Sequence, residues 1–148
     1  MIPKPSSQLT VRVATSEDAR KLALMLSFIE NGEITADEVR ARIEATQTTE
    51  TPFIAEQEGQ PAGFAFLRIV PAISTAEPYA EITELYVEDI TQRETIGSEM
   101  AQKLETLALE KGVVYLHLLT GLRNTEAKNT YRAMGYRDYA LALRKRLK

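Results

Sequence analysis

The chain has 148 residues, of which 44% are hydrophobic, and a formal net charge of -3 at pH 7. This length and composition suit one domain with a buried core, and the acidic balance argues against a nucleic-acid partner, because affinity for phosphate backbones requires clustered Lys and Arg. The chain contains no cysteine, which excludes disulfides, thiolate metal sites and a cysteine nucleophile.

The N-terminal residues carry no recognisable targeting signal. Residues 1–8 contain two prolines and two serines, which predicts a flexible leader before a single domain over residues 9–148. No apolar run approaches the roughly 20 residues that span a bilayer, and the leader lacks the hydrophobic centre of a signal peptide. We therefore expect a cytoplasmic protein that does not enter a membrane.

Two helices are predicted after a first strand at residues 9–13. Thr15 and Asp18 have the spacing of a capping box, in which a hydroxyl caps the helix and an acidic side chain three residues later reaches back. Thr35 and Glu38 repeat this pattern. Apolar residues recur at helical spacing after each box, so the sequence predicts two consecutive helices.

A hairpin and a further strand are predicted in the middle of the chain. Residues 52–56 and 62–70 have strand patterns, and Gly59 between them favours a tight turn. Residues 71–79 contain two prolines and favour an exposed connection. Residues 81–87 have the pattern of the next strand.

A strand, helix and strand follow in the C-terminal half. The helix is predicted from its apolar stripe, formed by Ile96, Met100, Leu104 and Ala108. Gly112 is expected to end it, and residues 113–119 form an apolar run typical of a central strand. The order strand, helix, strand indicates a parallel crossover between residues 81–87 and 113–119.

The last elements predicted are a helix over residues 124–134, closed by Gly135, and a final strand over residues 139–143. Glycine after the last helical residue is typical of a helix end. Tyr139, Leu141 and Leu143 alternate with small residues, which is the pattern of a strand.

The junction between residues 81–87 and 92–98 has the features of a site for a diphosphate. A helix begins with backbone N–H groups that have no partner within the helix. These donors and the positive end of the helix dipole attract anionic oxygens. The sequence therefore predicts an anionic ligand where this strand turns into the long helix.

Three segments in this order resemble the GNAT superfamily of acyl-CoA-dependent N-acyltransferases. They are EITELYV at 81–87, QRETIGS at 92–98 and NTEAKNTYRAMGY at 124–136. The likeness covers residues 9–147. It implies an α/β fold with a mixed, mostly antiparallel central sheet of about six to seven strands and about four flanking helices.

The phosphate-loop pattern of that family is Gln or Arg, two residues, Gly, one residue, Gly or Ala. It falls on Gln92, Thr95 and Gly97, so threonine stands where the family has its first glycine. Glycine lets a backbone approach a phosphate closely, and Glu94 adds a negative charge to the same loop. Arg93 offers a compensating positive charge to the ligand.

The resemblance implies acetyl-CoA as co-substrate and assigns no metal. The amides of its pantetheine arm are expected between the two parallel strands, and its diphosphate on the loop. Asn124 is also a natural helix cap, so both roles stay open for it. The expected cofactor contacts are Tyr86, Val87, Gln92, Arg93, Thr95, Ile96, Gly97, Ser98, Asn124 and Ala127.

A carboxylate on strand 81–87 often acts as general base in this family. Glu84 is the first choice here and Glu81 the second. Residues three apart on a regular strand face opposite sides, but family members commonly carry a bulge in this strand. An ordinary solvated carboxylate is the alternative for either residue.

Tyr131 matches the position that donates a proton or hydrogen bond to the departing CoA thiolate. Its alternative is a core aromatic on an amphipathic helix. His117 is the only histidine, and its place in an apolar strand favours a structural role.

The resemblance implies transfer of an acetyl group to a primary amine of a small molecule or peptide, by direct attack in a ternary complex. A longer acyl group is an alternative, as is a CoA- or ligand-binding sensor or interaction module without turnover, suggested by Thr95 and Glu94. A homodimer through a sheet edge stays open.

Overall fold

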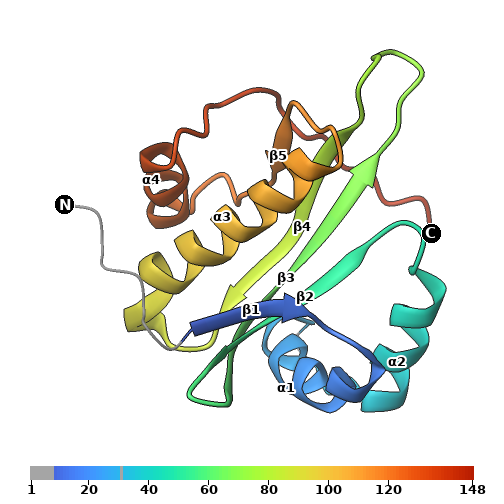
Figure 1. Cartoon of the computed structure of the whole chain (residues 1–148), viewed down its shortest axis with the longest axis vertical. Coiled ribbons are helices and arrows are strands. Elements are labelled where there is room, and N and C mark those ends of the chain that lie inside the picture. The colour runs from blue at the N-terminus through green and yellow to red at the C-terminus, as the bar shows by residue number, and fades with distance from the viewer. Residues whose placement is uncertain (1–8, 31) are drawn as a thin grey trace. The chain divides into compact units, whose positions relative to one another are not determined.

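The computed structural model of the chain describes residues 9–30 and 32–148, so the predicted leader at residues 1–8 lies outside the described residues. The chain divides into two compact units, Met1–Leu118 and Leu119–Lys148. The first unit contains the sheet, and the second contains a short helix (Figure 1).

A five-stranded sheet in the order β1-β2-β3-β4-β5 forms the centre of the first unit. Its first four strands run antiparallel to their neighbours, and β5 runs parallel to β4. The predicted mixed, mostly antiparallel α/β fold is confirmed, with five strands in place of six or seven. The strands are Leu9–Val13 (β1), Thr51–Gln57 (β2), Gln60–Val70 (β3), Tyr79–Val87 (β4) and Leu116–Leu118 (β5).

Four α-helices and two short 3-10 turns complete the described residues. None of these helices is long and apolar enough to cross a membrane. The α-helices are α1 (Ala19–Glu30), α2 (Ala36–Ala45), α3 (Arg93–Glu110) and α4 (Thr125–Ala133), and the turns are η1 (Ser16–Asp18) and η2 (Ile90–Gln92).

Both predicted capping boxes are present. The N–H of Glu38 donates to the Thr35 hydroxyl at 3.1 Å, and the N–H of Thr35 donates to the Glu38 carboxylate at 2.8 Å. Thr15 and Asp18 form the equivalent box at η1, which runs directly into α1. Each box satisfies backbone donors that a helix start would otherwise leave unpaired.

The hairpin turn between β2 and β3 is also confirmed. Glu58 and Gly59 have φ values of 54° and 78°. Positive φ at both central residues is the geometry of a two-residue turn whose twist matches the flanking strands. The strands then pair in register from Gln57 with Gln60 onward.

Helices cover both faces of the sheet. Leu22 of α1 belongs to a buried cluster with Ile54 and Phe64, which are paired across β2 and β3 and so share a face. Ala65 follows Phe64 and therefore points to the other face, together with its partner Leu85. Leu85 lies beside α3. The predicted stripe of α3 is buried on this second face and consists of Ile96, Met100, Leu104 and Ala108.

The parallel crossover is confirmed, but β5 is shorter than predicted. Only Leu116–Leu118 of the apolar run at 113–119 form a strand. Gly112, with φ of 80°, follows α3 as expected for a helix end. The Val113 side chain is buried at 5% exposure, so part of the apolar run packs into the core without pairing as a strand.

The second unit contains α4 but not the strand predicted at residues 139–143, and that prediction was wrong. The side chains of Tyr139, Leu141 and Leu143 are 82%, 69% and 87% exposed. An alternating pattern is a property of a single segment. A strand forms only when the backbone of that segment pairs with a neighbouring strand. No such pairing exists for this segment within the described part of the chain.

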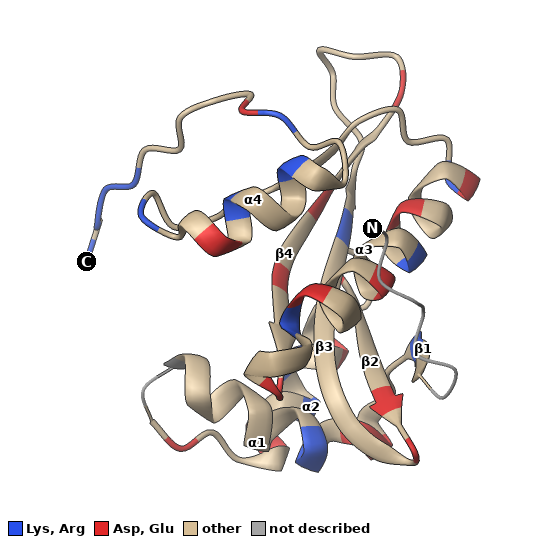
Figure 2. Cartoon of the chain, turned by 90° about the vertical axis from the view of Figure 1, so that its left-hand side faces the viewer, with Lys and Arg blue, Asp and Glu red and all other residues tan. Residues whose placement is uncertain are grey.

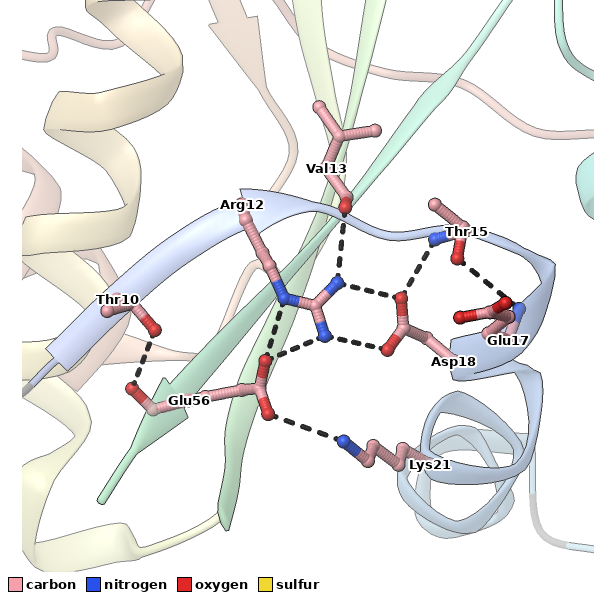
Figure 3. A network of polar contacts seen from close by, with 8 residues as sticks. All are labelled: Thr10, Arg12, Val13, Thr15, Glu17, Asp18, Lys21 and Glu56. Carbon is pink, nitrogen blue, oxygen red and sulfur yellow. Dashed lines mark hydrogen bonds and ion pairs between the residues drawn. The ribbon is translucent and has the colours of Figure 1, made fainter. Parts of the chain in front are cut away.

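A partly buried ion-pair network links the start of α1 to the edge of the sheet (Figure 3). Arg12 of β1 donates two hydrogen bonds to Asp18, at 2.9 and 2.8 Å, and one to Glu56 of β2 at 2.8 Å. Lys21 of α1 lies 3.3 Å from the same Glu56 carboxylate. Asp18 is only 5% exposed, and its hydrogen bonds to Arg12 lower the pKa of its carboxyl to about 2.

Because of this network, we expect the chain to lose stability in acid as the Asp18 carboxylate becomes protonated. Its pKa is lower in the folded chain than its ordinary value of 3.8, so its contribution is complete above about pH 4 and disappears as the pH falls toward 2. Asp18→Asn keeps the cap acceptor but removes the charge, and we expect it to cost up to about 2 kcal/mol at pH 6. Urea unfolding at pH 6 and pH 2.5 checks this.

Asp37→Asn provides a matched control. Asp37 pairs with Arg40 at 2.7 Å, but its side chain is 93% exposed, and exposed pairs contribute about 0.5 kcal/mol. The gap between the wild type and Asp18→Asn should narrow at pH 2.5, because that pH lies below the ordinary pKa of 3.8 but still above the folded-state value of about 2. Asp37→Asn should stay near the wild type throughout. An equal loss for both variants at pH 6 would contradict the role of the Arg12–Asp18 pair.

Replacing a glycine by alanine should have opposite effects on stability at Gly63 of β3 and at Gly97 of α3. A Cβ on Gly63 would overlap the carbonyl oxygen of Tyr86, whereas a Cβ on Gly97 would lie 3.7 Å from Leu85, an ordinary contact. Gly63→Ala should therefore destabilise the fold by about 1–3 kcal/mol. Gly97→Ala should be neutral or stabilise it by up to about 1 kcal/mol, because alanine favours helix. Urea unfolding of the two variants distinguishes them, and equal stabilities would contradict this packing.

Candidate active site

A β-bulge interrupts β4 at Thr83. Phe66 of β3 is paired with Glu84, and the next residue, Leu67, is paired with Ile82. Thr83 therefore has no partner on β3 in this register and is the extra residue of the bulge. The break that the resemblance implied in this strand is confirmed.

The bulge places Glu81 and Glu84 on the same face of the sheet. Glu84 lies opposite Phe66, and Glu81 lies opposite Arg68. These two partners are two residues apart on β3 and share a face, so their partners on β4 share it as well. Glu84 is exposed and Glu81 partly exposed, and Figure 2 shows the acidic positions of β4 in red.

The two carboxylates have different neighbours. Glu81 forms an ion pair with Arg68 at 3.0 Å, between side chains that are 30% and 46% exposed. One oxygen of Glu81 is therefore held against β3. Glu84 follows the bulge directly, where the strand changes direction, and it lies next to the part of β4 that β5 does not cover.

The pairing between β4 and β5 ends just before the bulge. β5 pairs with Ala80, Glu81 and Ile82. Within residues 9–30 and 32–148, no strand pairs with the same edge of β4 at residues 83–87. The two parallel strands thus meet only over their first residues.

The backbone groups on this open edge are those of Leu85 and Val87. The N–H of Glu88 donates to the carbonyl oxygen of Ala62 on β3 at 2.9 Å. Alternate residues of an antiparallel strand bond to the same neighbour, so the polar groups of Tyr86 face β3. Leu85 and Val87 therefore direct their N–H and C=O groups to the other side, the edge of β4 that β5 leaves open beyond Ile82.

Tyr86 is placed away from this edge. Its ring stacks on Phe64 at 5.4 Å between centroids, on the face that α1 covers. Burial, followed by a hydrogen bond with Glu88, raises the pKa of the Tyr86 hydroxyl. Its side chain packs against the core, and Leu85, which sequence analysis did not name, is the neighbour whose backbone groups lie on the open edge with those of Val87.

The start of α3 follows the open edge through the turn η2. The N–H of Gln92 donates to Asp89 O at 3.0 Å, and the N–H of Arg93 donates to Ile90 O. Two of the four donors at the start of α3 are thus used inside the turn. The donors that follow begin at Glu94, and Gln92 makes no side-chain cap.

The loop residues divide into core and surface positions. Ile96 and Gly97 are buried, and Gly97 lies close enough to β4 that an added Cβ would be 3.7 and 3.9 Å from Leu85 and Val87. Arg93 and Glu94 are exposed, and Thr95 and Ser98 are half-buried. The first turn of α3 is therefore fixed against the end of β4, with its charged side chains outward.

The second unit brings Asn124, Ala127 and Tyr131 together at the start and middle of α4. Asn124 is the N-cap, and its side-chain oxygen accepts a hydrogen bond from the N–H of Ala127 at 3.1 Å. Tyr131 meets the ring of Tyr136 edge-on at 5.7 Å. Burial raises the pKa of the Tyr131 hydroxyl, so it stays protonated at neutral pH.

Sequence analysis did not single out Arg68, Thr83 and Glu50, and it gave His117 a structural role. Arg68 pairs with Glu81, and the hydroxyl of Thr83 donates to the carboxylate of Glu50, which directly precedes β2. His117 is the register partner of Glu81 on β5. These contacts follow from strand register, which spacing along one strand does not reveal.

No metal site accompanies these residues. Within the described ranges, no three His, Asp or Glu side chains gather in a way that could hold a metal ion. The polar groups around the bulge include carboxylates, the Arg68 guanidinium, the Thr83 hydroxyl and backbone amides, which suit proton transfer and hydrogen bonding.

Solved structures with a similar fold include an aminoglycoside acetyltransferase from an uncultured soil metagenomic sample in complex with sisomicin. It is 17% identical, with a TM-score of 0.79, and the match covers 95% of this chain and 97% of that chain. A ribosomal-protein-alanine N-acetyltransferase from Brucella melitensis biovar Abortus 2308 is 14% identical, with a TM-score of 0.78 and coverage of 93% and 99%.

A third structure, from Arthrobacter sp. FB24, is named provisionally as an acetyltransferase. It is 25% identical, with a TM-score of 0.80, and the match covers 98% of this chain and 100% of that chain. No curated protein matches the sequence. The sequence profile of the Acetyltransferase (GNAT) family matches residues 16–136, which include the bulged strand, the start of α3 and α4. The chain therefore belongs to the GNAT acetyltransferase family.

Proposed function

We propose that this protein transfers an acetyl group from acetyl-CoA to a primary amine by direct attack, with donor and acceptor bound together. The observation that carries the proposal is the geometry of β4. Its bulge sets Glu84 on one face directly before an open strand edge, and that edge leads into the N-terminus of α3. Family membership supplies the reaction class, acetyl transfer.

The open edge and the start of α3 suit the two polar parts of acetyl-CoA. The backbone groups of Leu85 and Val87 would pair with the pantetheine amides as a neighbouring strand does. The donors from Glu94 onward and the positive helix end would hold the diphosphate, with Gln92 and Arg93 beside it. Asn124 and Ala127 would contact the pantetheine arm from α4, as the resemblance implies.

Glu84 would take the proton of the acceptor ammonium. An amine attacks the thioester only in its neutral form, whereas alkyl amines are cations at neutral pH, so a nearby base accelerates the reaction. Glu84 is preferred to Glu81 because it directly follows the bulge and lies on the part of β4 that β5 does not pair with, whereas Glu81 lies within the paired part. The new C–N bond then replaces the C–S bond of the thioester.

Tyr131 would supply the proton that the departing thiolate needs. A tyrosine hydroxyl is protonated at neutral pH, which is the state a general acid requires, and burial raises the pKa of Tyr131 further. The edge contact with Tyr136 and the cap at Asn124 hold the helix that carries it.

The acceptor would be a primary amine of a small molecule or a peptide. The similar structures include an aminoglycoside acetyltransferase and a ribosomal-protein-alanine N-acetyltransferase. The first name describes acetylation of an aminoglycoside and the second N-acetylation of an alanine, so the two acceptors are chemically different. The exposed carboxylate of Glu84 would attract the positive charge that such acceptors share.

A second candidate is a CoA-binding sensor without turnover. It is favoured by the start of α3, where η2 uses two N–H donors and Glu94 adds a negative charge. A carboxylate facing the diphosphate would cost roughly 1 kcal/mol or more at short range. Turnover decides between the two candidates, because a sensor binds CoA and consumes no acetyl-CoA.

Calorimetric titration with acetyl-CoA tests the donor site. We expect micromolar affinity, and Gln92→Ala should weaken it by about 5- to 10-fold, the effect of losing one hydrogen bond. Gln102→Ala, farther along α3, is a matched control that should leave the affinity unchanged. No heat at millimolar acetyl-CoA would refute the proposed donor site.

Paired substitutions on β4 test the base. Glu84→Gln should lower kcat/KM for acetyl transfer by about 100-fold or more, because it removes the proton acceptor and keeps the shape. Glu81→Gln loses only a partly exposed ion pair and should change kcat/KM by less than about 5-fold. The assay follows CoA release with spermidine, sisomicin and a peptide with an N-terminal alanine. The reverse order of effects would assign the base to Glu81.

A further inference from the structure

We propose that Glu50 is a positioning residue for Glu84. Its carboxylate accepts a hydrogen bond from the hydroxyl of Thr83, the extra residue of the bulge. This contact would hold the bulge in the one arrangement that turns Glu84 to the face it occupies. The inference rests on the proposed function, in which Glu84 takes the proton of the acceptor.

Glu50 has a fixed backbone from which to act. Its N–H donates to the carbonyl oxygen of Thr46 at the end of α2, at 2.9 Å. The next residue, Thr51, begins β2 and is paired with Leu67 of β3. The backbone of Glu50 is therefore held by hydrogen bonds on both sides. Only the side-chain torsions of Glu50 still have to be fixed when its carboxylate meets Thr83.

Thr83 is the residue of β4 that most needs such an anchor. Its neighbours Ile82 and Glu84 are each paired with a residue of β3, whereas Thr83 is left out of that register. Bulged residues lose ladder bonds, and Thr83 is exposed, so burial does not fix it. A hydrogen bond to an ionised acceptor is stronger than a neutral one and supplies the missing restraint.

A small movement at Thr83 would have a large effect on Glu84. Shifting a strand by one residue sends each side chain to the opposite face. The face opposite Glu84 is the one that α3 covers, where Leu85 and Ile82 point. The residues beyond Glu84 are held by their own ladder with β3, so the disturbance should remain at Glu84 and leave the open edge intact.

Kinetics and donor binding together test this role. Glu50→Ala and Thr83→Val remove the hydrogen bond, and each should lower kcat by about 10-fold, since a slightly displaced base loses part of its contribution of 100-fold or more. The dissociation constant for CoA, measured by calorimetry, should change by less than about 2-fold. Glu50→Gln keeps an acceptor oxygen and should restore most of the activity.

A double-substitution cycle separates positioning from general damage. In a chain that carries Glu84→Gln, adding Glu50→Ala should cost no further activity, because there is no carboxylate left to position. Additive losses would overturn the inference, as would wild-type activity in Glu50→Ala. Weaker CoA binding in Glu50→Ala with unchanged kcat would also overturn it, because the effect would then lie in the donor site.

Amide hydrogen exchange gives a readout that does not depend on turnover. Residues 82–85 should exchange about 10-fold faster in Glu50→Ala and Thr83→Val than in the wild type and Glu50→Gln. Unchanged exchange would overturn the anchor even if the enzyme is active. If the wild type transfers acetyl to none of the acceptors, the proposed function and the positioning role of Glu50 in catalysis are refuted. Hydrogen exchange would then still show whether the contact between Glu50 and Thr83 holds the bulge.

Discussion

The one extra residue in β4 is the constraint on which the candidate site depends. Because Thr83 is inserted, Glu84 joins Glu81 on one face instead of facing the core under α3. A carboxylate buried there without a partner would cost several kcal/mol. The same insertion comes where pairing with β5 ends, at Ile82. A single residue thus sets the direction of the proposed base and also marks the start of the open edge proposed for the donor.

The two faces of the sheet hold this arrangement by different means. On one face, Gly97 lets α3 lie close to Leu85 and Val87, and buried Ile96 keeps the first turn in place. On the other, the core is apolar, but the start of α1 is fixed by the ion pair of the buried Asp18 carboxylate with Arg12. Apolar contacts adapt to small shifts, whereas a two-point guanidinium pair allows one geometry, so the start of α1 is fixed in direction as well as position.

Sequence patterns predicted the elements well where the signal was local. Both capping boxes, the hairpin at Gly59 and the stripe of α3 depend on residues within a few positions of one another. Sequence patterns failed where pairing with another strand determines whether a strand or a side-chain contact forms. Alternation at residues 139–143 predicted a strand, but no pairing for it exists among the residues that the structure describes. Spacing alone did not reveal that Arg68 meets Glu81 or that Glu50 meets Thr83. Register is a tertiary property, so these contacts had no local signal.

The structure also shows what threonine does to the backbone at position 95, where the phosphate-loop pattern has its first glycine. α3 begins at Arg93, so Thr95 lies within the first helical turn. Glycine is required where φ is positive, and a helical residue does not need that freedom, so Thr95 adds no backbone strain. Threonine is also a better helix former than glycine. What it alters is the distance at which a phosphate can approach, and its hydroxyl is itself a donor. The charge of Glu94, rather than the shape of the backbone, is therefore the larger obstacle to an anion at this helix end.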